Sequence, residues 1–125
     1  MKSTAALAAL ALLATASAAS AAEPLGCRTV GLDVDRDVIA VGKQEGRWTA
    51  VKLTVAGNDV EIYDLKIVYG GGKAEDFSVR SVIPKNGETR WIDLKGDGKA
   101  IRQIELVYRS VKERKGQAVI CAYGR

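Results

Sequence analysis

Apolar and polar residues alternate along most of the chain, in short segments separated by turns. In residues 48–56, Val51, Leu53 and Val55 share one parity, and the charged Lys52 has the other. This alternation is typical of a strand with one buried face and one solvated face. Since no segment has a sustained helical repeat of apolar residues, the pattern predicts an all-β domain.

Glycines beside polar residues mark the turns between these segments. The run that ends at Lys73 is interpreted as a hairpin tip, because it has no P-loop spacing and opens no helix. Short strands with regular turns predict a two-layer antiparallel β-sandwich, jelly-roll-like, of about seven or eight strands. The glycines are Gly42, Gly46, Gly57, Gly70, Gly71, Gly72, Gly87, Gly96, Gly98 and Gly116.

The alternation changes phase in one of the longest segments. Val60 and Ile62 share one parity, whereas Leu65 and Ile67 share the other. A bulge or a corner near Tyr63 is therefore expected, and a corner would pass the strand from one sheet to the other. The remaining expected interior residues are Tyr69, Phe77, Val79, Ile92, Leu94, Ile104, Leu106, Tyr108, Val119, Cys121 and Tyr123.

The first residues have the organisation of a secretory signal peptide. Lys2 is followed by an uncharged, alanine-rich stretch that continues to Glu23, with small residues before a cleavage site after Ala22 or Ala21. A membrane anchor is disfavoured because the apolar core is short, and a lipoprotein cleavage box is disfavoured by Pro24. We expect residues 1–22 to be removed and residues 23–125 to form a single β-sandwich domain without a membrane span.

Two cysteines, Cys27 and Cys121, lie near the ends of the predicted exported chain. In an oxidising compartment the default for such a pair is a disulfide, here joining the first and last strands. A redox-active pair is disfavoured because Cys-x-x-Cys spacing is absent. The protein is therefore expected to be exported, to the periplasm or the medium.

The titratable residues argue against most enzyme mechanisms. The chain has no histidine, so Ser-His-Asp and Cys-His arrangements and histidine metal sites are excluded. Carboxylate pairs, Asp59 with Glu61 and Glu75 with Asp76, are the remaining acid–base material and are typical of turns. The net charge of +4 comes from interspersed charges, which does not favour nucleic-acid binding. We expect a non-enzymatic domain without a cofactor.

Several segments carry a resemblance to a known family. They are residues 52–63, Ile67-Val-Tyr, Ser81-Val-Ile, Gly87-Glu-Thr-Arg-Trp-Ile, Ile104-Glu-Leu and the closing Val-Ile-Cys-Ala-Tyr-Gly. Together they resemble an uncharacterised family of small exported bacterial proteins, a domain of unknown function. The resemblance implies an exported β-domain and supplies no catalytic or binding residues.

Trp91 is the first candidate binding residue. Ile92 and Leu94 take the inward parity of their segment, so Trp91, Thr89 and Asp93 are expected on the outer face, with Arg90 nearby. An outward indole among hydrogen-bonding groups suits sugar stacking. The alternative is that a loop or a bulge covers the ring.

Charged runs supply two further candidates. The basic turn at 109–115 suits anionic groups such as phosphates or uronic acids, or is a solvated loop that protects a sheet edge; its cations are Arg109, Lys112, Arg114 and Lys115. Asp33, Asp35 and Asp37 have the alternate spacing of a calcium loop, but Val38 and Gln44 break that pattern, so no metal site is expected.

The sequence thus predicts a weak binding module for anionic or polyhydroxylated cell-envelope polymers. The partner would be an envelope polysaccharide or another envelope protein. The alternative is a structural or accessory envelope protein without a small-molecule ligand.

Overall fold

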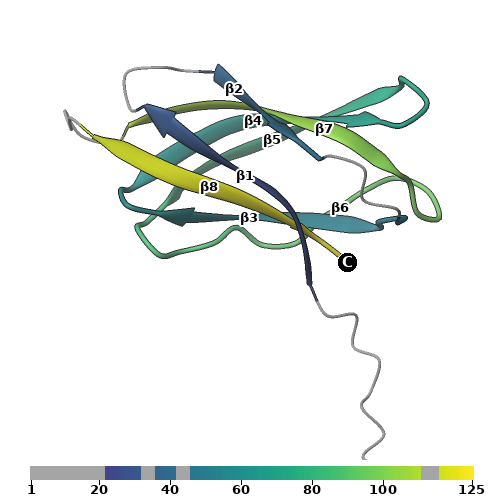
Figure 1. The fold of residues 1–125 in the computed structure, drawn as a ribbon, viewed down its shortest axis with the longest axis horizontal. Coiled ribbons are helices and arrows are strands. Elements are labelled where there is room, and N and C mark those ends of the chain that lie inside the picture. The colour runs from purple at the N-terminus through teal and green to yellow at the C-terminus, as the bar shows by residue number, and fades with distance from the viewer. Residues whose placement is uncertain (1–21, 32–35, 42–45, 111–115) are drawn as a thin grey trace, which may run out of the picture.

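The computed structural model describes residues 22–31, 36–41, 46–110 and 116–125, which form eight strands and no helix. The strands are arranged in two layers, one with the order β1-β8-β3-β6 and the other with the order β2-β7-β4-β5 (Figure 1). This nested pairing of first with last strand is that of a jelly roll. The predicted all-β, jelly-roll-like sandwich is confirmed. The strands are β1 (Glu23–Gly31), β2 (Arg36–Ala40), β3 (Ala50–Ala56), β4 (Val60–Tyr69), β5 (Ala74–Ile83), β6 (Ile92–Asp93), β7 (Ile101–Ser110) and β8 (Gln117–Gly124).

Branched aliphatic side chains fill the space between the sheets. They come from the inward parity of each strand, as the alternation predicts, and Phe77 and Val79 pack against them while partly exposed. Burying such side chains is the main favourable contribution to folding. The predicted core residues Val51, Leu53, Ile67, Ile92, Ile104 and Leu106 are all buried.

The phase change in β4 is a bulge. The register shifts between Ile62 and Asp64 against both neighbouring strands, so Ile62 and Leu65 are both buried although they differ in parity. Because β4 pairs with β5 and β7 on both sides of the bulge, it stays in one sheet. The predicted bulge is present. The prediction that the strand passes to the other sheet is wrong.

The inner and outer faces of strand β8 are the reverse of those expected. Ala118, Ile120 and Ala122 face the core, whereas Val119 is 36% exposed. Apolar residues occupy both parities of this strand, so hydrophobicity alone does not choose its inner face. The expectation that Val119, Cys121 and Tyr123 are interior is wrong. Ala122 pairs with Leu53 and Ile120 pairs with Val55, so this parity of β8 faces the same side as the buried residues of β3.

The predicted disulfide between Cys27 and Cys121 is confirmed. The two residues lie directly opposite each other in the β1–β8 pairing, and the exposed Cys27 places the bond on the outer face of this sheet. Strand β1 is an edge strand with β8 as its neighbour in the sheet. The bond therefore fixes an edge strand rather than the core.

Replacing both Cys27 and Cys121 by serine should lower the free energy of unfolding by about 4 kcal/mol, because the bond closes a long loop in the unfolded chain. The sequence separation is 94 residues. Thermal unfolding followed by circular dichroism should show a lower Tm with the β signal retained at low temperature. An unchanged Tm would contradict this prediction.

A tight contact lies where Trp48 packs against glycine backbone. The indole is 6% exposed. A Cβ atom at Gly124 would lie 2.9 Å from Trp48 Cδ2, and one at Gly46 would lie 2.8 Å from Trp48 Cζ2. The end of β8 therefore needs glycine so that the indole can cover it.

We expect Gly124→Ala to destabilise the fold by about 1–3 kcal/mol, since the added methyl group must displace a buried indole. Gly71→Ala is the matched control, because nothing lies within 4 Å of its Cβ position. Urea unfolding of the two variants measures the difference. Equal stabilities would show that the contact with Trp48 is loose.

Candidate functional site

Trp91 lies on the outer face of the sheet β1-β8-β3-β6, just before β6, and is partly exposed. Two cations lie against its ring. Lys52 Nζ from β3 is 4.9 Å from the ring centroid, and Arg125 Cζ, directly after β8, is 4.5 Å away. These three residues, which we name the Trp91 cluster, are far apart in the sequence and come from neighbouring positions in the sheet.

A bulge beside β3 sets the direction of Trp91. Thr54 pairs with Glu88, but Val51 pairs with Ile92. Between these pairs, two residues of β3 lie opposite three residues of the segment before β6. This extra residue is a β-bulge. As a result Thr89 and Ile92 both face the core, at 8% and 4% exposure. The expectation that Thr89 shares the outer face with Trp91 is wrong because of this extra residue.

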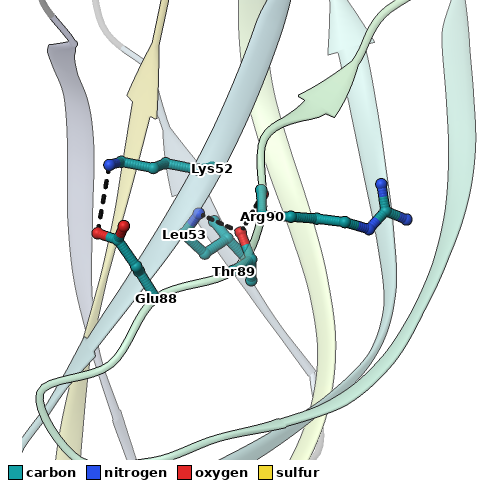
Figure 2. Close-up of polar contacts among 5 residues, drawn as sticks. All are labelled: Lys52, Leu53, Glu88, Thr89 and Arg90. Atoms are coloured by element: carbon teal, nitrogen blue, oxygen red, sulfur yellow. Dashed lines mark hydrogen bonds and ion pairs between the residues drawn. The ribbon is translucent and has the colours of Figure 1, made fainter.

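The Thr89 hydroxyl completes the hydrogen bonding of the β3 edge. The Leu53 amide donates to Thr89 Oγ1 at 3.0 Å, and this hydroxyl donates to the Arg90 carbonyl at 2.8 Å (Figure 2). The Thr89 amide in turn donates to the Leu53 carbonyl at 2.8 Å. A side-chain oxygen thus replaces the backbone acceptor that the bulge removes. The sequence contains no signal for this role beyond the presence of a threonine.

Arg90 and Lys52 point in different directions (Figure 2). Lys52 Nζ forms an ion pair with Glu88 Oε2 at 3.2 Å. Arg90 instead points away from that pair and lines a hollow of about 280 Å³ beside β5, together with Ser81. Arg90 is therefore not part of the Trp91 cluster. Asp93 is exposed and pairs with Ala50 in the β3–β6 ladder.

Arg109 lies on the other outer face of the sandwich. Its Nε is 2.6 Å from Glu61 Oε1, and its guanidinium lies 5.1 Å from the centroid of the Tyr63 ring. The hydrogen bond to Glu61, and then the charge of that carboxylate, raise the pKa of Arg109 above its ordinary value. Since Trp91 belongs to the opposite sheet, the expected joint site of Trp91 and Arg109 is wrong. Lys112, Arg114 and Lys115 lie outside the described residues.

Asp37 has a structural partner. Its Oδ1 is 2.8 Å from Arg28 Nε and accepts a hydrogen bond from the Val38 amide at 2.9 Å. Asp33 and Asp35 lie outside the described residues. Within the described ranges, no group of three or more histidine, cysteine or acidic residues is arranged to hold a metal ion.

Fold and surface together define a jelly-roll β-sandwich domain that presents an aromatic ring and two cations on one sheet face. The chain belongs to the family described as "Domain of unknown function (DUF2541)", whose model matches residues 5–124. This confirms the resemblance to an uncharacterised domain family. A search of curated proteins finds no match.

A solved structure has a similar fold. It is described as "Structural and functional characterization of Pseudomonas aeruginosa AlgX", with 15% sequence identity and a TM-score of 0.59. The alignment covers 82% of this chain and 26% of that one, so this chain corresponds to about a quarter of its length. At this identity the likeness shows the fold alone.

Across the described ranges, no helix is long and apolar enough to cross a membrane.

Thr89→Val should destabilise the protein by about 1–3 kcal/mol, because valine has the same shape but leaves the buried Leu53 amide without its acceptor. Thr89→Ser, which keeps the hydroxyl, is the matched control and should lose less. Urea unfolding measures both. If the valine variant is as stable as the serine variant, the hydrogen bond to Leu53 does not support the β3 edge.

Proposed function

We propose that this protein is an exported, non-catalytic binding domain whose Trp91 cluster contacts anionic or polyhydroxylated polymers of the cell envelope. The observation that carries the proposal is a partly exposed indole with two cations against it on an outer sheet face. An aromatic face covers the C–H groups of a sugar, and guanidinium or ammonium groups bind carboxylate, sulfate or phosphate oxygens.

The arrangement favours an anionic polymer over a neutral one. Lys52 and Arg125 both lie over the Trp91 ring, so a neutral sugar has to displace a cation before it can stack there. An anionic group binds these cations where they already lie. Lys52 shares its charge with Glu88, whereas Arg125 forms no ion pair within the described part of the chain. Arg125 is therefore the residue on which anion binding should depend most.

Two further features support an exported domain without catalysis. Disulfides persist in oxidising compartments, which agrees with export to the periplasm or the medium. Three of the four carboxylates considered for acid–base chemistry also have structural partners. Asp59 Oδ1 accepts the Lys85 amide, Glu61 pairs with Arg109, and Glu75 accepts the Tyr69 hydroxyl. Carboxylates that hold turns and strands in this way are poorly placed to transfer protons to a ligand.

A structural or accessory role is the second candidate, and one observation favours it. Besides its ring contact, Arg125 accepts backbone hydrogen bonds from Thr49 and Ala50 and donates to the Ala50 carbonyl. The Trp91 cluster would then fasten the end of β8 to the neighbouring strand. In that case its loss would lower stability and change no binding.

Binding should be measured on immobilised polygalacturonate, with its methyl-esterified form as the neutral comparison. We expect the wild type to prefer the charged polymer and to lose affinity as salt rises. Arg125→Gln should weaken binding about tenfold, the size expected for one charge-assisted hydrogen bond. Trp91→Ala should weaken it as well.

Arg109→Gln is the matched control, because it removes the same charge from the opposite sheet. It should leave binding unchanged. If the wild type does not bind, or if Arg125→Gln and Arg109→Gln have equal effects, the Trp91 cluster is not a binding site. A loss of stability in Trp91→Ala would then support the structural role.

A further inference from the structure

A second surface of one charge sign lies where the β4–β5 hairpin contacts the β6–β7 connection, through a hydrogen bond from the Gly70 amide to the Ala100 carbonyl at 2.9 Å. Both segments lie at the same end of the sandwich (Figure 1). It is a hollow of about 360 Å³, and its charged lining residues are Arg47, Lys73 and Lys99. All three are cations, from three different segments of the chain. We name this hollow the hairpin-end site.

The cation Lys99 is held in place by its neighbours. Its Nζ lies 4.5 Å from the centroid of the Tyr69 ring. Gly96 has a φ of +94°, and a Cβ atom there would lie 3.3 Å from Lys99 Cε. The glycine thus adopts a backbone conformation that other residues avoid and leaves room for the lysine chain. An immobilised cation loses less conformational entropy when it binds a ligand.

Arg47 and the hairpin backbone complete the wall. Arg47 Nη1 donates to the Gly98 carbonyl at 3.5 Å. The hairpin closes through hydrogen bonds from the Tyr69 amide to the Lys73 carbonyl at 2.8 Å and from the Gly72 amide to the Tyr69 carbonyl at 2.9 Å. Glycines without side chains therefore form the wall next to Lys73, and a ligand can approach the backbone closely there.

Tyr69 adds no negative charge beneath Lys99. The ring is 5% exposed, and its hydroxyl donates to Glu75 Oε1 at 2.6 Å. Burial, and then this hydrogen bond, raise the pKa of Tyr69 above its ordinary value, so the phenol stays neutral. The neighbouring acid is thereby turned toward the tyrosine, and it does not line the hollow.

The charge of this hollow is unbalanced within the described residues. Arg47, Lys73 and Lys99 form no ion pair there, whereas Arg28, Lys52 and Arg109 each do. Another hollow, of about 420 Å³, differs, since its lining mixes Asp64, Asp76 and Glu105 with Arg36 and Lys66. Unpaired cations gathered around a hollow attract anions.

We propose that the hairpin-end site binds an oxyanion, namely a carboxylate, sulfate or phosphate group. The cationic side chains supply charge-assisted hydrogen bonds to its oxygens. The volume falls in the range of small-ligand sites and exceeds the needs of a bare oxyanion, so the group belongs to a larger ligand such as an acidic sugar. The proposal does not depend on polymer binding by the Trp91 cluster.

The test is an NMR titration of the disulfide-bonded protein with inorganic phosphate, sulfate and galacturonate, and with galactose as the neutral comparison. The amide signals of Gly70, Gly71 and Lys99 should shift and saturate with at least one of the anions but not with galactose. The anion that binds most tightly identifies the ligand chemistry. Lys73→Gln and Lys99→Gln should each weaken this binding about tenfold.

Lys85→Gln is the matched control, since Lys85 lies beyond β5 at the opposite end of the β4–β5 pair and carries the same charge. It should leave the affinity unchanged. Shifts that do not saturate, or equal losses in Lys85→Gln and Lys73→Gln, would overturn the proposal. The side-chain indole signal of Trp91 reports on the Trp91 cluster separately, so failure at one surface is distinguishable from failure at the other.

Discussion

The edge of β3 that faces away from β8 imposes the constraint on which the Trp91 cluster depends. Leu53 and Val55 lie in the core, so their backbone groups have to be paired on the side away from β8. The segment between β5 and β6 provides the partners. Asn86 donates to the Val55 carbonyl, Val55 donates to the Gly87 carbonyl, and the Thr89 hydroxyl accepts from Leu53. The bulge that brings Thr89 inward is also what turns the following indole outward, beside Lys52.

The two candidate surfaces share one end of the sandwich. The segment before β3 connects them, because Trp48 pairs with Lys99 and the Thr49 amide donates to the Arg125 carbonyl. Arg47 is the next residue on one side, and Arg125 belongs to the Trp91 cluster. Cations from both surfaces therefore contribute to the potential at this end. Grouped charges of one sign raise the local concentration of an anionic ligand before any specific contact forms.

Parity along the strands predicts most of the core, because one face of each sheet is buried and the register is fixed by that burial. It fails in β8, where Val119 and Ile120 are both apolar, and before β6, where a bulge inserts an extra residue. A bulge can be inferred where apolar residues change phase, as they do around Tyr63, but Thr89 and Arg90 are polar and leave no such trace.

The hairpin-end site cannot be predicted from the sequence, for a different reason. The topology brings Arg47, Lys73 and Lys99 together, and their spacing in the sequence matches no strand or helix period that would place them on one face.

The aromatic rings decide which cations remain available to a ligand. A ring attracts a cation through its quadrupole and fixes its position without cancelling its charge. An ion pair fixes the cation and also neutralises it. Arg109 has both a ring and the Glu61 carboxylate, so its charge is already satisfied. Arg125 over Trp91 and Lys99 over Tyr69 have the ring contact without an ion pair in the described part of the chain. A cation held against an aromatic ring without an ion pair is therefore common to both surfaces and leaves a positive charge available to an anion. Charged residues that hold the fold together, such as Arg28 and Arg109, differ because each forms an ion pair.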